Sequence, residues 1–532
     1  MKKVIRYMSF VGLLMAGGCS GFLDGEPLTQ ITDENFYQTK ADAEMAIVGC
    51  YDGMQQLYSS GVAFPTASEV FSDNCFGGVG NNDAYNYQVL DEFDLQRSPG
   101  EVNIFDENWK NYYKAIYRSN ALLQKMDQID WEGDETAKVE TEAEARFLRA
   151  YAYFDMVRLW ERVPLVLEPV NGNIPQSESD STYKAITEDL LFAAEFGSET
   201  VSPGKVNRFV AKAYLAKVFL FYTGYYGKSD LVGLVSKEEV LTGLEEVISS
   251  GNYQLIADFK DLWPAASSYT SASGEELQTT YAGKDNAETV FAIKYNITSD
   301  YDGNTDGNHW LVMLGLRDAK SKSYSPYGKG WGACTVNPKL YNSYATNDNR
   351  RDASIIAIEE EGLDFDVSDQ REYSGYTNKK YTPLANPDGT DVAEANGAVN
   401  FQIGQFQDYV VMRYADVLLM AAELGSANAQ DYLDQVRGRA GLGSVAATNE
   451  NILRERMWEF AFEGIRYWDL LRQGVEVAAA TVNQVITLQD GGVDTEKTIK
   501  ASNLIETRGL QMIPQNQITR SGGVLTQNEG WK

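Results

Sequence analysis

The stretch RERMWEFAFEGIRYWDLLRQG, residues 454–474, constrains the fold more than any other part of this 532-residue chain. At helical spacing, one apolar stripe runs along the segment and includes the residue before it, comprising Leu453, Met457, Phe460, Ala461, Gly464, Trp468 and Leu471. A second apolar stripe lies beside the first and is formed by Trp458, Phe462 and Ile465. A helix with two apolar stripes must be covered on more than one side, so the pattern predicts a largely buried helix.

The same segment carries acidic and basic side chains, and a buried helix can hold these only if they are paired. Opposite charges stand three residues apart in the pairs Arg456/Glu459, Glu463/Arg466, Arg466/Asp469 and Asp469/Arg472. Side chains at this spacing can meet on one face of a helix. The spacing therefore predicts an ionic helix in the interior of the protein.

Further sequence blocks follow one another along the chain. They are EAEARFLRAYAYFDMVRLWERVPLV (residues 142–166), VMRYADVLLMAAE (411–423), LDQVRGRAGL (433–442) and MIPQNQI (512–518). Weaker blocks are ETVFAIKY (288–295) and the set Pro338, Leu340, Tyr344, Asp348, Arg350 and Arg351. Together with residues 454–474, the blocks resemble, in order, the signatures of the SusD/RagB family of glycan-binding outer-membrane lipoproteins.

The resemblance implies a mainly α fold in which tetratricopeptide-like helix pairs form a scaffold, at about residues 33–262 and 411–532, around a loop-rich insertion at about 263–410. The residue pattern predicts a first helix from Asp33 or Thr39, and further helices at about 109–128, 136–160, 182–195, 207–222 and 237–249. Gly251 follows the last of these as a C-cap. A strict repeat of 34 residues is not found. Short strands are predicted at 290–295 and 410–413, and helices from about 415 through 472.

The N-terminus resembles that of an exported lipoprotein. Basic Lys2, Lys3 and Arg6 precede an apolar stretch at residues 10–16 that is too short to span a bilayer. Small residues then lead to Cys19, although Ala16 stands where a lipobox usually has leucine. We predict a signal peptide at 1–18, acylation of Cys19, a tether at 19–32 and the SusD-like domain at 33–532. The alternative is an ordinary cleaved signal peptide with an incidental cysteine.

Charge and cysteine content exclude several classes of protein. The net charge is -30 and no basic cluster interrupts the acidity, which argues against nucleic acid and against docking on anionic lipid. The remaining cysteines are Cys50, Cys75 and Cys334, and none has the spacing of metal ligands. We predict mostly buried free thiols, with a Cys50–Cys75 disulfide as the alternative.

Ligand recognition is expected in two polar, aromatic stretches at residues 72–88 and 301–331, where the resemblance also implies ligand contacts. A sugar offers an apolar ring face and a rim of hydroxyls, so its site needs aromatic platforms beside short polar groups. The candidate glycan-binding residues are Asp73, Asn74, Tyr85, Tyr87, Trp310, Tyr327 and Trp331. For each aromatic the alternative is packing in the core, which is the preferred interpretation for Trp109, Trp160, Trp458 and Trp468.

No cofactor is predicted. Asp300 and Asp302 begin a segment spaced like a calcium loop, but Thr305 and Leu311 occupy the positions that need glycine and glutamate in an EF-hand. A looser calcium site near Asp300 and Asp302 is the remaining alternative. The single histidine, His309, leaves no material for a zinc site or a histidine-based catalytic triad.

The resemblance implies a non-catalytic, cell-surface glycan-binding lipoprotein, anchored in the outer membrane by lipid. It also implies a partner, a SusC-like TonB-dependent transporter that receives the oligosaccharide. Two other classes of function stay open. A secreted glycoside hydrolase would need a pair of carboxylates that no sequence context singles out, and a helical-repeat scaffold would bind a peptide or protein.

Overall fold

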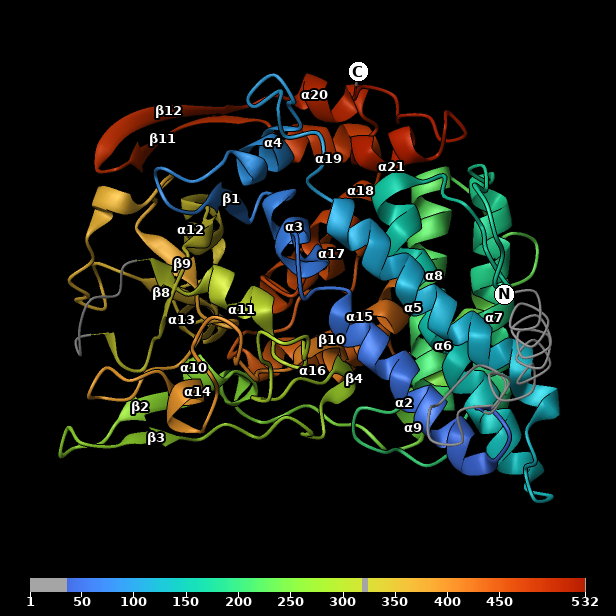
Figure 1. Ribbon diagram of the computed structural model, residues 1–532. Helices are drawn as coiled ribbons and strands as arrows, with labels where there is room; N and C mark the ends of the chain where they lie inside the picture. Colours follow the sequence, from blue (N-terminus) through green and yellow to red (C-terminus); the bar gives the residue numbers. More distant parts are fainter. Residues whose placement is uncertain (1–35, 318–323, 532) are drawn as a thin grey trace, which may run out of the picture.

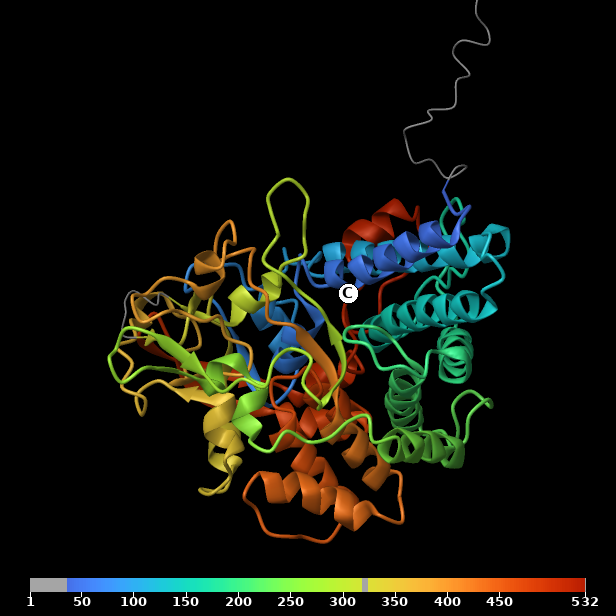
Figure 2. The same cartoon turned by 90° about the horizontal axis from the view of Figure 1, so that it is seen from below.

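The computed structural model describes residues 36–317 and 324–531, so the predicted signal peptide, Cys19 and the whole predicted tether lie outside the described residues. The long helices are α2 (Lys40–Gln56), α5 (Asp106–Lys125), α6 (Glu135–Trp160), α7 (Ser179–Phe196), α8 (Arg208–Tyr226) and α9 (Lys237–Ser249). Figures 1 and 2 show them on one side of the molecule and the loop-rich segments on the other. Within the described ranges, no helix is both long enough and apolar enough to cross a membrane.

The helix ends follow local capping rules. Thr39 caps α2 through a reciprocal pair of hydrogen bonds with Asp42, and Ser236 caps α9 in the same way with Glu239. Gly251, just past α9, has a φ of 68°, a conformation that glycine adopts without steric cost. These local signals explain why the helices predicted before residue 250 agree closely with the observed ones.

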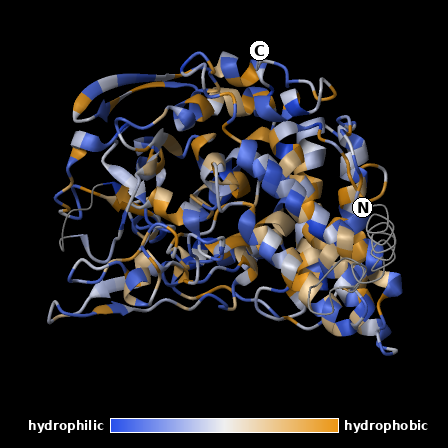
Figure 3. Ribbon diagram, in the orientation of Figure 1, coloured by the Kyte–Doolittle hydropathy of each residue, from blue (hydrophilic) through white to orange (hydrophobic). Residues whose placement is uncertain are grey.

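Consecutive helices of this scaffold pack side by side, α5 on α6, α6 on α7, α7 on α8 and α8 on α9. Ala211, Ala213 and Ala216 of α8 are fully buried, and their small side chains allow neighbouring helices to approach closely. In Figure 3 the long helices carry both hydrophobic and hydrophilic segments, as expected for helices that bury one face. The arrangement confirms the predicted scaffold of paired helices.

The loop-rich part is built from short elements. Its helices are α3 (Phe64–Val70), α4 (Asn86–Glu92), α10 (Pro264–Ser267), α11 (His309–Leu314), α12 (Pro338–Ser343), α13 (Arg350–Ser354) and α14 (Val392–Ala395). Its strands are β1 (Cys75–Gly78), β2 (Ser268–Thr270), β3 (Leu277–Thr279), β4 (Thr289–Ile293), β5 (Leu316–Arg317), β6 (Lys329–Gly330), β7 (Ala333–Val336), β8 (Ile355–Ala357) and β9 (Tyr376–Asn378). A four-stranded sheet has the order β1-β7-β9-β8. Because β1 pairs with β7, the early stretch is joined to the insertion.

The C-terminal part returns to helices. It contains α15 (Tyr414–Glu423), α16 (Ala429–Arg439), α17 (Asn449–Glu459), α18 (Arg466–Leu471), α19 (Val475–Val482), α20 (Ala501–Glu506) and α21 (Gln515–Arg520). The predicted strand before it is β10 (Tyr409–Arg413), which pairs antiparallel with β4, the other predicted strand. A hairpin of β11 (Gln484–Asp490) and β12 (Val493–Ile499), seen at the upper left of Figure 1, was not predicted.

All three cysteines in the described part of the chain are buried free thiols, so the predicted state of Cys50, Cys75 and Cys334 is confirmed. The alternative Cys50–Cys75 disulfide is not formed.

Residues 454–474 do not form the single helix that their spacing predicts. Helix α17 ends at Glu459, and α18 begins at Arg466. Between them Phe462 and Gly464 have φ values of 68° and 73°, a left-handed conformation that no α-helix continues through. Most residues of the apolar stripes are buried as expected, although Leu453, Met457 and Trp458 are only partly buried. The stripes lie on two short helices and the turn that joins them.

The predicted ionic interior is confirmed, although most of its pairs are different. Asp469 and Arg472 are 2.8 Å apart, as their spacing predicts. Arg456 instead pairs with Asp469 of the next helix and with Asp416 of α15, each at 2.7 Å. The remaining charges pair outside the stretch: Glu459 with Arg350, Arg413 and Arg439, Glu463 with Lys380 and Arg413, and Arg466 with Asp73. The turn after α17 redirects these side chains toward residues distant in sequence.

This interior network makes a prediction about acid. Burial alone would raise the pKa of Asp416, but Lys217 and Arg456 lower it to about 2. A carboxyl group with a folded pKa below its unfolded value of about 3.9 stabilises the fold at neutral pH, and the stabilisation is lost as the pH falls through the folded pKa. We expect the free energy of unfolding by urea to fall between pH 5 and about pH 2, by on the order of 2 kcal/mol from Asp416.

The control is the Asp416→Asn variant, which should be less stable at pH 7 and show a weaker dependence on pH. Equal pH slopes for the variant and the unaltered protein would contradict the assignment.

Candidate ligand-binding site

An open hollow of about 440 Å³ lies between the two stretches in which ligand contacts were expected. Its lining comprises Val79, Asp83, Ala84, Asn86 and Tyr87 from the first stretch, and Met313, Arg317 and Trp331 from the second. The pairing of β1 with β7 holds the two stretches together. Residues 72–88 and 301–331 therefore converge at one surface of the loop-rich part.

Trp331 is held in this hollow by its backbone. Its N–H donates to the carbonyl oxygen of Val312 in α11 at 2.9 Å. A Cβ atom on Gly330 would lie 2.2 Å from the same oxygen, and Gly332 has a φ of 72°, so both neighbours of Trp331 need to be glycine. The indole is only partly buried, and the His309 ring meets it edge to face at 5.8 Å between centroids. Trp331 is thus a fixed aromatic ring at the wall of an open hollow.

Polar groups beside Trp331 centre on Arg317. Its Nε and Nη2 atoms donate to Oδ2 of Asp369 at 3.0 and 2.7 Å, and Nη1 lies 3.3 Å from Oδ2 of Asp83. All three side chains are partly exposed to solvent. The group offers hydroxyls both donors and acceptors in fixed directions, and its net charge is one negative.

The loop at residues 77–88 forms one wall of the hollow, and a buried arginine holds this loop from the side away from the hollow. Arg371 is 2% exposed and donates to the carbonyl oxygens of Asn81, Asp83 and Ala84, at 2.9, 2.6 and 3.1 Å, and to Oε1 of Gln88 at 3.1 Å. Its guanidinium carbon lies 4.0 Å from the ring centroid of Tyr85. Arg371 therefore fixes the shape of the loop that carries Asp83.

Sequence reasoning did not single out Arg317, Asp369 or Arg371. Their roles come from contacts across more than fifty residues, and no local spacing signals such contacts. Asp83 belongs to the first predicted stretch but was not among the chosen candidates. The available signal was that Arg317 falls within the second predicted stretch, residues 301–331.

Two polar candidates, Asp73 and Asn74, lie away from the hollow. Asn74 is fully buried and its amide nitrogen donates to Oε2 of Glu69 at 2.9 Å. Both carboxylate oxygens of Asp73 accept from Arg466, at 2.8 and 3.0 Å. Neither side chain lines the hollow. Asp73 connects the early stretch to α18, and Asn74 connects it to α3, so both have a structural role.

Two aromatic candidates, Trp310 and Tyr327, are buried. Trp310 is 3% exposed and packs against Tyr381 and Tyr409, with centroid distances of 5.1 and 5.6 Å. Tyr327 is 6% exposed, and its hydroxyl donates to Oε2 of Glu361 at 2.6 Å. Buried rings cannot present a face to a sugar. The helix α11 places Trp310 inward, so the short apolar run after it belongs to the core.

The remaining aromatic candidates lie at the first stretch. Tyr87 lines the hollow although only 5% of it is exposed, and burial raises its pKa above the usual range. Tyr85 is 41% exposed, but the guanidinium groups of Arg371 and Arg97 lie 4.0 and 5.3 Å from its ring. Tyr87 therefore supplies part of the wall, and Tyr85 lies beside it as a cation–π partner.

The predicted loose calcium site stays a prediction. Oδ1 of Asp300 accepts from the backbone N–H groups of Asp302 and Asn304, at 2.8 and 3.0 Å. Across residues 36–317 and 324–531, no group of three or more histidine, cysteine, aspartate or glutamate side chains is arranged to hold a metal ion.

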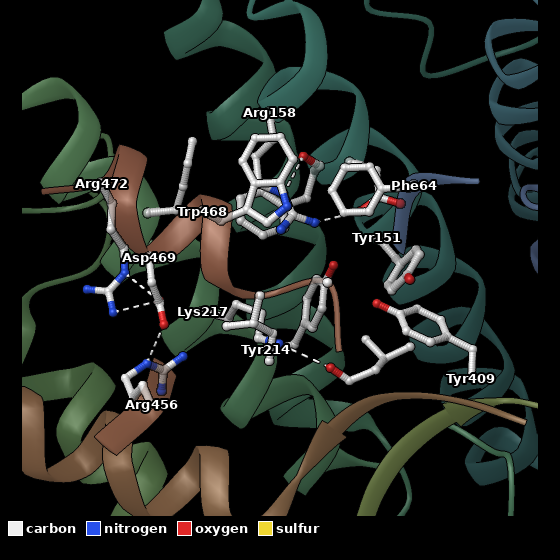
Figure 4. Close-up of a pocket in the computed structure, with 16 residues that line it drawn as sticks. Phe64, Tyr151, Arg158, Tyr214, Lys217, Tyr409, Arg456, Trp468, Asp469 and Arg472 are labelled. Carbon is white, nitrogen blue, oxygen red and sulfur yellow. Dashed lines mark hydrogen bonds and ion pairs between the residues drawn. The ribbon is translucent and has the colours of Figure 1, made fainter. Parts of the chain in front are cut away.

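A second cavity, in the interior, has a different character (Figure 4). It measures about 40 Å³ and lies beside α18, with Arg158, Lys217, Arg456, Asp469 and Arg472 among its lining residues. A buried water needs about 10–15 Å³, so this space suits a few water molecules and excludes a sugar ring. It belongs to the ionic interior of the scaffold.

Comparison with known proteins places this architecture in a family. Residues 364–531 match the SusD family, and residues 22–220 match the family described as "Starch-binding associating with outer membrane". The two ranges together span more than two thirds of the chain. The chain belongs to the SusD/RagB family.

Relatives and solved structures agree. The "SusD-like protein P2" of Formosa agariphila is 26% identical over 506 residues, which span 89% of this chain and 91% of that protein. A "Laminarin binding SusD-like protein" has a similar structure, with a TM-score of 0.72, 25% identity, and coverage of 92% of this chain and 99% of the other. A surface glycan-binding protein A from Bacteroides thetaiotaomicron, solved with laminarihexaose, has a TM-score of 0.73 at 21% identity. The match covers 92% of this chain and 100% of that protein's chain. At this identity the match supports the fold alone.

Proposed function

We propose that this protein is a non-catalytic glycan-binding lipoprotein of the outer membrane that binds its ligand in the hollow beside Trp331. The observation that carries the proposal is that the indole of Trp331 lines one open hollow together with Arg317 and Asp83, and that Arg317 also pairs with Asp369. A pyranose ring can stack on the indole while its hydroxyls exchange hydrogen bonds with the polar group. Membership of the SusD/RagB family supports this use of the surface.

The ligand class is a neutral oligosaccharide. The polar group at the hollow has one net negative charge and the whole chain has -30, so a sulfated or uronic acid polymer would be repelled. One solved structure similar to this one, at 25% identity, is named as a laminarin-binding SusD-like protein. Laminarin is therefore the first probe, followed by starch, fructan and plant cell-wall glucans.

Affinity electrophoresis of the mature protein in gels that contain each polysaccharide tests the proposal. We expect retardation by at least one neutral glycan and none by a sulfated one. Incubation with the same polysaccharides should release no new reducing ends, because Asp83 and Asp369 both pair with Arg317. Release of reducing ends would favour a glycoside hydrolase, and migration unaffected by any polysaccharide would contradict glycan binding.

Membrane attachment through Cys19 gives a separate prediction. The residue follows a short apolar stretch and small residues. Replacement by Cys19→Ala should prevent acylation and move the protein from the membrane fraction to the soluble fraction. Stable anchoring by lipid takes two or more acyl chains, and no helix within residues 36–317 and 324–531 could span the membrane in their place. Labelling with palmitate, followed by fractionation, measures both effects. Persistent labelling of the variant would contradict the assignment of the lipid to Cys19.

The transporter partner is also part of the proposal. Family membership implies a SusC-like TonB-dependent transporter, with this protein as a lid that delivers bound oligosaccharide. Purification from the native membrane in mild detergent should bring a large outer-membrane protein with it. Recovery of the lipoprotein by itself across several detergents would argue for a free-standing binder.

A further inference from the structure

The hairpin β11–β12 places a lysine behind the loop at residues 77–88. This loop lines the hollow and is called the ligand loop. Lys497 of β12 is almost fully buried, with 4% of its side chain exposed. Its ammonium nitrogen lies 2.7 Å from Oδ2 of Asp91, 3.1 Å from Oε1 of Glu92 and 2.5 Å from Oε1 of Glu372. These three carboxylates come from α4 and from the segment after η4 (Val367–Asp369), so one ammonium group joins three distant parts of the chain.

The same carboxylates hold the backbone of the ligand loop. Oδ2 of Asp91 accepts from the N–H of Gly77 at 2.9 Å. Oε2 of Glu372 accepts from the N–H of Gly78 at 3.0 Å and from Nε2 of Gln88 at 3.1 Å. Val79 and Tyr87, which line the hollow, are the next residues along the chain from these contacts. The position of the wall therefore depends on where Asp91 and Glu372 lie.

Electrostatics make these positions depend on Lys497. Burial lowers the pKa of Lys497, but the attraction of Asp91, Glu372 and Glu92 outweighs it and raises the pKa well above the usual range. The cluster holds three carboxylates against this one ammonium, and Arg97 adds a contact to Glu92 at 3.8 Å. Without the ammonium group, buried like charges would repel one another.

The tip of the hairpin contacts the same wall. The N–H of Gly491 donates to the carbonyl oxygen of Gln370 at 2.9 Å, and the N–H of Glu372 donates to Oδ1 of Asp490 at 2.8 Å. Arg371, which holds the loop at Asn81–Ala84, lies between these two contacts in sequence. The hairpin therefore contacts the wall in two places, through Lys497 and through Asp490 and Gly491 at its tip.

We propose that Lys497 is a positioning residue for the ligand hollow: from the far side of the wall, it sets the backbone at Gly77 and Gly78 and thereby the affinity for glycan. The inference rests on the proposed function, since it gives that same hollow a determinant that does not touch the ligand.

The experiment compares Lys497→Met with Lys380→Met. Lys380 is a matched control because it is fully buried and bonds to Glu463 at 2.7 Å and to the carbonyl oxygen of Glu459 at 2.8 Å, away from the hollow. Two quantities are measured well below the melting temperature. One is hydrogen exchange of the peptide that contains Gly77 and Gly78, and the other is retardation in laminarin gels, or in gels of whichever glycan binds.

Both variants should lower the melting temperature. Hydrogen exchange at Gly77 and Gly78 should accelerate in Lys497→Met and not in Lys380→Met. The dissociation constant of the glycan should rise about ten-fold for Lys497→Met and change less than about two-fold for Lys380→Met. If Lys497→Met does not fold, Lys497→Arg serves instead: it keeps the charge, but its planar guanidinium cannot donate in the three directions of an ammonium group, and it should weaken binding about three-fold.

Equal losses of affinity in the lysine variants at both positions, or unchanged exchange at Gly77 and Gly78 in the Lys497 variants, would overturn the inference. Faster exchange with unchanged affinity would overturn it as well, since the wall would then move without consequence for the ligand. An unaltered protein that binds no glycan would instead contradict the proposed function, and the exchange arm would still decide whether Lys497 positions the wall.

Discussion

Replacing Trp331 with alanine should strongly reduce retardation in laminarin gels, or in gels of whichever neutral glycan binds, while the melting temperature changes little. The indole lines an open hollow and is only partly buried, so its loss removes a stacking face without opening a cavity in the core. An aromatic contact of this kind contributes on the order of 1–2 kcal/mol, which is about a five-fold to thirty-fold loss of affinity.

Trp310→Ala is the matched control for this change. Trp310 lies in the same part of the chain but is 3% exposed and packs against Tyr381 and Tyr409. Its removal should cost about 3–5 kcal/mol of unfolding free energy, as for other buried tryptophans. Retained glycan binding by Trp331→Ala would move the site elsewhere. A parallel loss of stability in both variants would mean that Trp331, too, belongs to the core.

Replacing Glu459 with alanine should destabilise the fold by about 3–5 kcal/mol, because it removes a buried carboxylate shared by three arginines and leaves their buried charge less compensated. The carboxylate is fully buried and pairs with Arg413 at 2.9 Å and Arg350 at 3.1 Å, and it also contacts Arg439. Urea unfolding of the mature protein measures the change. Glycan affinity of the folded variant should stay as it was, since none of these residues lines the hollow.

Glu450→Ala provides the comparison on the same helix. Glu450 is exposed and pairs with Arg454 one turn away, and such surface pairs contribute about 0.3–0.5 kcal/mol. A similar small change for both variants would show that the interior network does not stabilise the scaffold. A loss of affinity in Glu459→Ala without a loss of stability would connect residues 454–474 to the ligand instead.

The helical scaffold was predictable because its signals are local. Thr39 and Ser236 each come three residues before the acidic residue that completes a capping box, and Gly251 lies where a left-handed residue is needed. The family blocks carried the rest, since they imply the order of helices and the loop-rich insertion between them.

The turn inside residues 454–474 was not predictable from hydrophobic spacing. Apolar residues at helical spacing describe α17 and α18 equally well whether or not a turn separates them, and Phe462 gives no sign of its positive φ. The ion pairs were misassigned for the same reason. Arg466 turns away from Glu463 and meets Asp73, a residue nearly four hundred positions earlier.

The candidate site was predictable as a region and not residue by residue. Both stretches line the hollow, as does Trp331, whose glycine neighbours mark a position without regular packing. Trp310 was misplaced because a tryptophan at the start of an apolar run fits a platform and a core equally well. Arg317 was missed because its value depends on Asp83 and Asp369, which only the fold brings to it.

The most direct test of the central claim is a crystal structure of the mature protein with a neutral oligosaccharide that retards it, starting with laminarihexaose. We expect a sugar ring against the indole of Trp331, with hydroxyls within hydrogen-bond distance of Arg317 or Asp83. A sugar bound at another surface, with the hollow between residues 72–88 and 301–331 empty, would contradict it.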